Sequence, residues 1–243
     1  MDVKIIYEDE NVLVVDKPAG IVVFPEGQTT ENTVIDYLVE KFPALNNVGE
    51  APRYGIAHRL DKDTSGILLV AKNTESLIFL QKQFKNREVE KKYATLATGV
   101  VKENSGIIHT LIGRAKNDPR KQVAHSLEYK GKKGLREAIT EYKVLERFID
   151  PSTSLRASYT LLEVKIKTGR KHQIRCHLAY LKNPIAGDKI YGFKNSPIPE
   201  GLGRQFLHAS YLKILLSDGV IKEFNSDLPK ELISILKTLN TKS

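Results

Sequence analysis

Short runs of apolar residues, broken by polar turn residues, recur along much of the chain. Alternating positions, or four to eight apolar residues bounded by turn residues, are typical of strands. We therefore expect strands at 3–7 and 11–15 on either side of an acidic turn, and a buried strand at 67–71. Runs rich in β-branched and aromatic residues predict four more strands, at 92–98, 106–112, 138–145 and 159–168.

Apolar residues spaced three and four positions apart predict four amphipathic helices. The first covers 33–42 and ends at Pro43, the second follows a cap at Thr74, and the others cover 172–181 and 227–239. In the helix at 172–181 the apolar spacing turns Arg175 away from the apolar face. Many strands with few helices predict an α+β protein, with a large mixed, mainly antiparallel sheet flanked by helices and loops. No repeat or long linker interrupts the chain, so we expect one domain over 1–243.

Composition limits the classes of protein that the chain can belong to. The 243 residues are 41% apolar, which is enough for a packed core. No window approaches the roughly 20 apolar residues of a membrane span, and the first residues do not form a signal peptide, so we expect a cytoplasmic protein with no membrane partner. The single cysteine, Cys176, excludes an internal disulfide and a zinc site made of several cysteines.

Positive charge is unevenly distributed. The net charge is +9, yet residues 1–50 hold 3 Lys and Arg against 10 Asp and Glu. Residues 165–194 hold eight Lys and Arg against one acid. Such a density suits a phosphate backbone, although a solvated protein face can look the same.

The segment H-R-L-D-K-D-T-S-G (58–66) places acids, bases and hydroxyls in a polar loop before the buried strand. Loops on rigid scaffolds often carry catalytic groups, but an Asp in a turn can simply accept backbone N–H groups. A Ser-His-Asp hydrolase would need Ser65, His58 and Asp61 to converge, and the G-x-S-x-G turn is absent. A glycosidase could pair Asp61 with Asp63, about 7 Å apart on one side of an extended segment.

A second polar cluster, T-G-R-K-H-Q-I-R-C-H (168–177), opens the helix at 172–181. The free N–H groups at a helix start attract anions, and Arg170 and Lys171 strengthen the attraction, so we expect a phosphate or carboxylate there. A metal site built from His172 and His177 fails, because five residues along a helix turn the two rings roughly 140° apart. We read both as hydrogen-bonding or RNA-facing groups and expect no metal.

Two further segments have weaker patterns. The tripeptide Lys91-Lys92-Tyr93 lies on an expected strand, where the simplest interpretation is a packed tyrosine between solvated lysines. Residues 113–136 are rich in Gly, Lys and Arg with little periodicity, and we expect an irregular basic excursion.

Six segments together resemble the RluA-type family of pseudouridine synthases. Their order and spacing matter more than any one motif, and H-R-L-D-x-x-T-S-G is the most specific of them. The segments are Y-E-D-E-N-V-L-V-V-D-K-P-A-G-I-V-V (7–23), H-R-L-D-K-D-T-S-G-I-L-L-V-A-K (58–72), K-K-Y (91–93), T-G-R-K-H-Q-I-R-C-H-L (168–178), P-I-A-G-D-K-I-Y-G (184–192) and R-Q-F-L-H-A (204–209).

The resemblance implies an RNA pseudouridine synthase, an isomerase that moves uracil from an N1 to a C5 linkage without a cofactor. It implies that Asp61 is the catalytic carboxylate, acting either as nucleophile at C1′ or as base at the ribose 2′ position. Arg175 would pair with Asp61 and favour its ionised form. Arg59 would fill the place of an extruded base, and Tyr93 would lie against the flipped uracil.

The remaining site residues follow from the same resemblance and from charge. His58 is expected to orient the loop, and Lys17 with Pro18 to shape the pocket wall. The expected RNA contacts are Arg114, Lys116, Arg120, Lys121, Arg170, Lys171 and His172. We therefore expect the partner to be a structured RNA, either ribosomal or transfer RNA. We expect no obligate protein partner and a monomeric enzyme.

The chain departs from the family pattern in places. Phe24-Pro25 stands where His-Pro is frequent, and Tyr54 where a Pro is frequent, which puts local substrate contacts in doubt. The family pattern also starts near the first residue, without the small RNA-binding module that precedes it in many relatives. We therefore expect the catalytic domain itself to recognise RNA.

Overall fold

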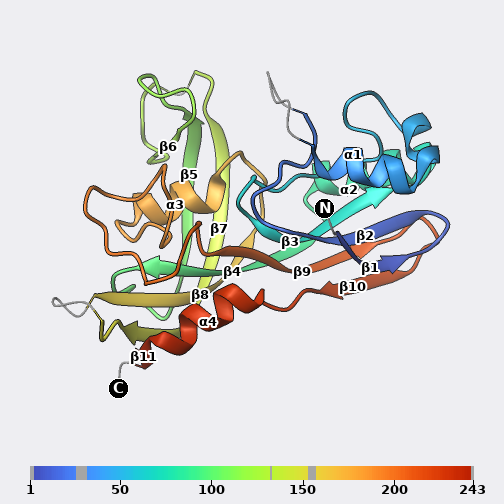
Figure 1. Cartoon of the computed structure of the whole chain (residues 1–243). Coiled ribbons are helices and arrows are strands. Elements are labelled where there is room, and N and C mark those ends of the chain that lie inside the picture. The colour runs from blue at the N-terminus through green and yellow to red at the C-terminus, as the bar shows by residue number, and fades with distance from the viewer. Residues whose placement is uncertain (1–2, 26–31, 132, 153–156, 242–243) are drawn as a thin grey trace. The chain divides into compact units, whose positions relative to one another are not determined.

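Strands dominate the computed structural model of the chain, which describes residues 3–25, 32–131, 133–152 and 157–241. The chain divides into two units, one made of Met1–Lys91 and Ala209–Asp227, the other of Lys92–His208 and Leu228–Ser243. The strand pairs described below are antiparallel and the helices are few, which confirms the expected fold class (Figure 1). The expectation of a single domain stays a prediction.

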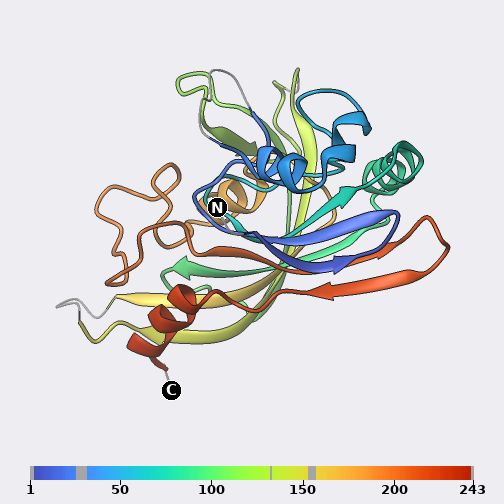
Figure 2. The same cartoon turned by 45° about the vertical axis from the view of Figure 1, so that its right-hand side comes forward.

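The first unit is built on antiparallel strands, of which β2 (Val12–Lys17) and β3 (Ser65–Ala71) are the most buried. Strand β1 (Lys4–Glu8) pairs with β2, and β2 pairs with β3, whose seven residues are all buried. Further along the chain, β9 (Leu207–Leu215) pairs with β10 (Ile221–Asn225). Figure 2 shows these two hairpins, β1–β2 in blue and β9–β10 in red.

Two α-helices and a short 3-10 helix complete the first unit. Helix α1 (Val34–Lys41) begins with a capping box between Thr33 and Asp36, and the 3-10 helix η1 (Pro43–Asn47) follows it. Helix α2 (Thr74–Asn86) packs on β3. The expected cap at Thr74 is wrong by one position: the extended residue Asn73 accepts the Ser76 N–H at 2.8 Å, and Thr74 is the first helical residue.

The second unit arranges its strands in the order β4-β8-β7-β5-β6. Its helices are α3 and α4, and the short β11 pairs with β7. The bounds are β4 (Glu90–Thr98), β5 (Ser105–Arg114), β6 (Gln122–His125), β7 (Arg136–Ile149), β8 (Ser158–Ile166), α3 (Gln173–Tyr180), α4 (Lys230–Thr238) and β11 (Asn240–Thr241).

Sequence reasoning did not predict the 3-10 helix η1 or the strands β6, β9, β10 and β11. Strand β6 lies inside the segment 113–136 that we expected to be irregular, so that expectation is wrong there. The four residues of β6 pair with the end of β5 and form a hairpin, a tertiary arrangement that a four-residue run hardly announces. Strands β9 and β10 were also missed, because polar residues such as His208 and Ser210 interrupt their apolar pattern.

Helix α3 is enclosed by its unit. The six residues from Gln173 to Leu178 are all buried, so its polar residues need partners inside the protein. His177 lies between two threonines, with its Nε2 2.9 Å from Thr110 Oγ1 on β5 and its Nδ1 2.8 Å from Thr140 Oγ1 on β7. Burial, aided by the charge of His109, lowers the pKa of His177 to about 4 and keeps its ring neutral. His177 is therefore a hydrogen-bonding residue of the core.

Candidate functional site

The loop 58–66 holds Asp61 on a tight turn in the first unit. The Thr64 N–H donates to the Asp61 carbonyl at 3.1 Å, and Leu60, Thr64 and Ser65 are buried around it. Asp61 itself is half-buried. The turn thus fixes the backbone of a carboxylate-bearing residue just before a buried strand.

Lys17 anchors this loop from below. Its side chain is fully buried, and its Nζ donates to the carbonyls of Pro18, Ile21 and Lys62 at 2.7 to 2.9 Å. The Gly20 N–H also donates to the Lys62 carbonyl, at 2.9 Å. A buried ammonium group needs hydrogen-bond acceptors, and here the acceptors are backbone carbonyls. They tie the turn at 17–21 to Lys62, the residue after Asp61. Lys17 as a substrate contact stays a prediction; its visible contacts are with the loop.

His58 fixes the other end of the loop. Its Nε2 accepts the Leu69 N–H at 2.9 Å, and its ring stacks on Phe84 with 4.7 Å between centroids. Enclosure of the ring, with the charge of Lys91 nearby, lowers the pKa of His58 to about 3, so the ring is neutral and Nε2 can accept. These contacts support the loop-orienting role expected for His58.

Arg59 lies over an aromatic ring that sequence reasoning left without a role. Its guanidinium carbon is 5.2 Å from the centre of the buried Phe24 ring, and Arg53 lies 5.0 Å from the same centre. Partial burial lowers the pKa of Arg59, while the negative charge of Asp61 raises it. Arg59 is therefore close enough to Asp61 to feel its charge, and Phe24 supports the planar guanidinium.

Lys91 corrects the interpretation of the K-K-Y segment. It is buried, not solvated, with its Nζ 5.4 Å from the centre of the Phe84 ring, and burial lowers its pKa to about 8. Lys92 does face solvent in part and lies 3.7 Å from Glu163. Tyr93, on β4 of the second unit, is buried opposite Val164.

Arg175 in the second unit is held by a carboxylate. Its Nε donates to Asp188 Oδ2 at 2.8 Å and its Nη2 to Asp188 Oδ1 at 2.9 Å, and both residues are buried. The guanidinium carbon also lies 5.2 Å from the centre of the Tyr191 ring. A side-on pair of this kind fixes the plane of the guanidinium as well as its charge.

The start of α3 satisfies part of its own hydrogen bonding. The Gln173 side chain accepts from Thr168 Oγ1 at 2.7 Å and from the Arg170 N–H at 3.0 Å. Arg170 Nε donates to the Glu137 carbonyl at 2.9 Å, and His172 Nδ1 lies 3.1 Å from the Tyr191 hydroxyl, while Lys171 is exposed. The phosphate site expected here stays a prediction.

The basic residues at the end of β5 and in the β5–β6 connection lie at the surface. Arg114, Lys116 and Arg120 are exposed, and Lys121 is half-buried. Arg120 donates two side-chain hydrogen bonds and its backbone N–H to Asp118, and these contacts lower the pKa of Asp118 to about 2. Part of the positive charge of Arg120 is thus compensated, which leaves the others to act on a phosphate backbone. Their role as RNA contacts stays a prediction.

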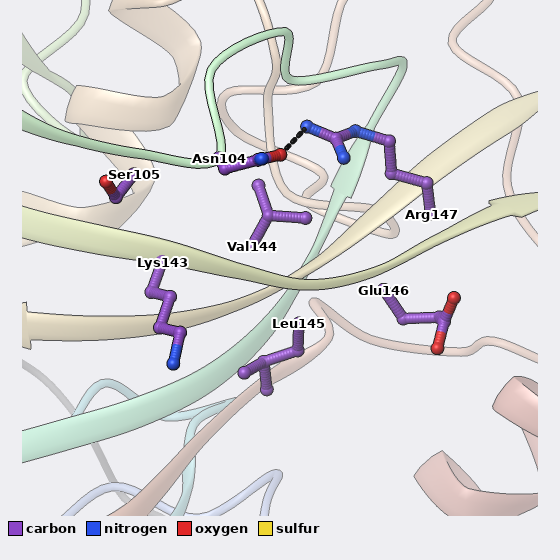
Figure 3. A pocket seen from close by; sticks show the side chains of 7 residues that line it. All are labelled: Asn104, Ser105, Lys143, Val144, Leu145, Glu146 and Arg147. Atoms are coloured by element: carbon purple, nitrogen blue, oxygen red, sulfur yellow. Dashed lines mark hydrogen bonds between the residues drawn. The ribbon is translucent and has the colours of Figure 1, made fainter.

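A surface hollow of about 530 Å³ lies at an irregular part of β7 (Figure 3). The β7–β8 register shifts between Val144 and Glu146, and Figure 3 shows Lys143 and Leu145 pointing to one side of the strand. The Arg147 guanidinium donates hydrogen bonds to the carbonyls of residues 101 and 102 and to the Asn104 side chain. None of the expected site residues lines this hollow.

Comparison with known proteins agrees with this combination of fold and loop. Residues 11–180 match the model of the RNA pseudouridylate synthase family. An uncharacterized RNA pseudouridine synthase of Aquifex aeolicus is 42% identical over 82% of this chain and 59% of its own length. Ribosomal large subunit pseudouridine synthase D of Borreliella burgdorferi is 39% identical over 96% of this chain and 68% of its own length.

A solved structure shares the fold. Human RNA pseudouridylate synthase domain containing 1 superimposes with a TM-score of 0.78 at 27% identity, covering 100% of this chain and 89% of that one. The chain belongs to the RNA pseudouridylate synthase family, whose reaction is the isomerisation of uridine in RNA. The resemblance seen in the sequence is confirmed. Within the described residues, no helix has both the length and the apolar character to cross a membrane.

Proposed function

We propose that this chain is an active RNA pseudouridine synthase that isomerises specific uridines in structured RNA. The observation that carries the proposal is the family match over residues 11–180, which includes Asp61, Tyr93 and Arg175. The turn that fixes Asp61 supports it, because a catalytic carboxylate must be held in place before the substrate arrives. The enzyme acts on RNA in the cytoplasm, as a monomer and without a protein partner.

The reaction breaks the C1′–N1 bond, turns the freed uracil, joins it through C5 and removes the C5 proton. Asp61 supplies the carboxylate, either as nucleophile at C1′ or as base at the 2′ position. Arg175 keeps that carboxylate ionised in a site closed over a base. Tyr93 stacks on the flipped uracil, and Arg59 takes the vacated place in the RNA stack, which offsets the cost of unstacking.

Ribosomal RNA of the large subunit is the favoured substrate, because relatives such as the Borreliella burgdorferi enzyme are named for it. Transfer RNA is the second candidate. Pseudouridine mapping in total RNA from cells with and without the protein identifies the target directly. If cells without the protein keep every pseudouridine found in cells with it, the proposed activity is contradicted.

Asp61→Asn tests the chemistry in vitro. We expect no detectable pseudouridine, with RNA affinity within about threefold of the unaltered protein, because the amide keeps the shape but not the charge. Asp63→Asn is the matched control on the same loop, and it should keep full activity. Product formation by Asp61→Asn would rule out the carboxylate role. Loss of activity in both variants would favour a paired-carboxylate mechanism instead, and hydrolysis of free nucleosides would identify it.

A module that binds RNA without modifying it is the alternative from another class. It would keep the basic surface and lack the chemistry, so the unaltered protein would bind RNA and leave every uridine unchanged. The presence of all three catalytic residues favours the enzyme.

A further inference from the structure

The segment P-I-A-G-D-K-I-Y-G (184–192) has a motif-like pattern but no role in the chemistry proposed above. Its backbone is fixed on both sides. The Ala186 N–H donates to the Leu96 carbonyl at 2.8 Å, and the Ala186 carbonyl accepts the Phe206 N–H at 2.9 Å. A Cβ at Gly187, where φ is +76°, would lie 2.2 Å from the Arg204 carbonyl oxygen, so only glycine fits before Asp188.

Asp188 uses this rigid turn to collect four N–H donors. Its Oδ1 accepts from the backbone N–H groups of Ile190 at 2.9 Å and Tyr191 at 3.0 Å, and from Arg175 Nη2 at 2.9 Å. Its Oδ2 accepts from Arg175 Nε at 2.8 Å. Burial raises the pKa of Asp188, but the Arg175 guanidinium and these N–H groups lower it by more, so the carboxylate stays ionised.

We infer that Asp188 is a positioning residue for catalysis, which fixes the orientation of the Arg175 guanidinium through a side-on pair while Tyr191 packs on it. Arg175 lies on helix α3, which is enclosed by its unit. The helix cannot rotate as a whole, because His177 on the same helix is hydrogen-bonded to β5 and β7. The pair with Asp188 removes the remaining freedom, that of the side chain. Its Nε and one Nη2 N–H are committed to Asp188, and the other N–H groups of the fork keep a fixed direction.

An electrostatic argument supports the same role. A guanidinium whose task is to stabilise a carboxylate and a developing charge is effective only if it is already oriented, because reorientation would add to the barrier. A buried carboxylate partner also lets the cation remain charged in an enclosed place, which a neutral partner would do less well. Asp188 supplies both properties without itself touching the substrate.

Asp188→Asn is a sharp test, because all four partners of the carboxylate are donors. An asparagine with its oxygen in the Oδ1 place keeps both backbone hydrogen bonds, so the turn can form. Its NH₂ group then faces the Arg175 Nε–H and breaks the bond that orients the guanidinium. We expect kcat for pseudouridine formation to fall about 100-fold, as for a group displaced by about an ångström, with RNA affinity nearly unchanged.

The matched control is Glu231→Gln, which removes the carboxylate partner of another arginine in the second unit, 2.9 Å from Arg204 Nη2, and should leave kcat unchanged. Asp188→Glu keeps the charge but lengthens the side chain, and we expect a kcat loss of about tenfold. A kcat within about twofold of the unaltered protein in both Asp188 variants would overturn the inference. So would equal losses of RNA affinity and kcat, since the pair would then only hold the fold.

A second measurement does not depend on activity. In the unaltered protein the Arg175 Nε–H should exchange slowly with solvent in ¹⁵N NMR spectra, and Arg175→Lys assigns the signal by removing it. Asp188→Asn should make this exchange fast, and exchange as slow as before would overturn the inference. The kcat prediction rests on the proposed function. An inactive unaltered protein would refute that function, and the NMR exchange measurement would still test whether Asp188 orients Arg175.

Discussion

The loop 58–66 and the segment 113–121 both carry charged side chains between strands, yet the protein treats them in opposite ways. The first is tied by Lys17, His58 and Gly20 and has buried residues within it. The second is displayed to solvent, with Arg120 and Asp118 paired on its surface. The difference suits two tasks: chemistry needs groups held in place, whereas a phosphate backbone needs only accessible positive charge.

The largest effect on the fixed loop 58–66 is expected from substitution of Lys17. Lys17→Met removes a buried donor from three carbonyls, which should lower the free energy of unfolding by about 3 kcal/mol and reduce pseudouridine formation with it. Chemical denaturation and single-turnover assays measure the two effects. Lys4→Met, at an exposed lysine of β1, is the control and should change neither. An unchanged stability for Lys17→Met would mean that the loop does not depend on its anchor.

A smaller effect is expected at Phe24, which supports Arg59. Phe24→Leu keeps an apolar side chain but removes the aromatic face, and turnover should slow about two- to fivefold on base-paired targets. Turnover on unpaired targets should change less, because extrusion is easier there. In an Arg59→Ala background the same substitution should have no further effect on turnover. An additive loss in the double variant would show that Phe24 does not act through Arg59.

The exposed segment should respond weakly and through salt. Arg114→Gln with Lys116→Gln should weaken RNA binding about three- to tenfold, and lower the slope of log affinity against log salt by about 1.5. The maximal rate at saturating RNA should not change. Lys82→Gln with Lys85→Gln, at exposed positions on α2, removes the same charge elsewhere. An equal loss in that control would mean that overall charge, not this segment, attracts RNA.

Sequence reasoning found the two units' main strands and helices because their apolar spacing is regular. It missed β6, which has only four residues, and β9, whose apolar pattern is interrupted by polar residues. The same limit applies to the site. Motifs predicted Asp61, Arg59 and Arg175 as site residues, and these roles stay predictions. Asp188 needed the structure, because nothing in the letters G-D-K-I-Y says that the carboxylate faces Arg175. The resemblance marked the segment, and only the contacts gave it a role.

Lys91 and Phe24 were misjudged or left unassigned for a related reason. A lysine on a strand is usually solvated, and burial of Lys91 beside Phe84 results from how α2 and the start of β4 meet. Phe24 was read as a departure from the family pattern that puts only local substrate contacts in doubt, and it was given no role of its own. Its ring lies under two arginines, which no local pattern could reveal.

Gly66, the last residue of the loop, has a consequence for how this protein can vary. Its φ is +111°, and a Cβ there would lie 2.2 Å from the Ala209 carbonyl oxygen on β9, while its backbone is in register with Lys17. The loop therefore enters β3 with both ends fixed and no slack. Insertions or deletions between 58 and 66 would disrupt the fixed loop ends, whereas the β5–β6 connection can change in length. Across natural variants, the first should be constant in length and the second free to adapt to different RNAs.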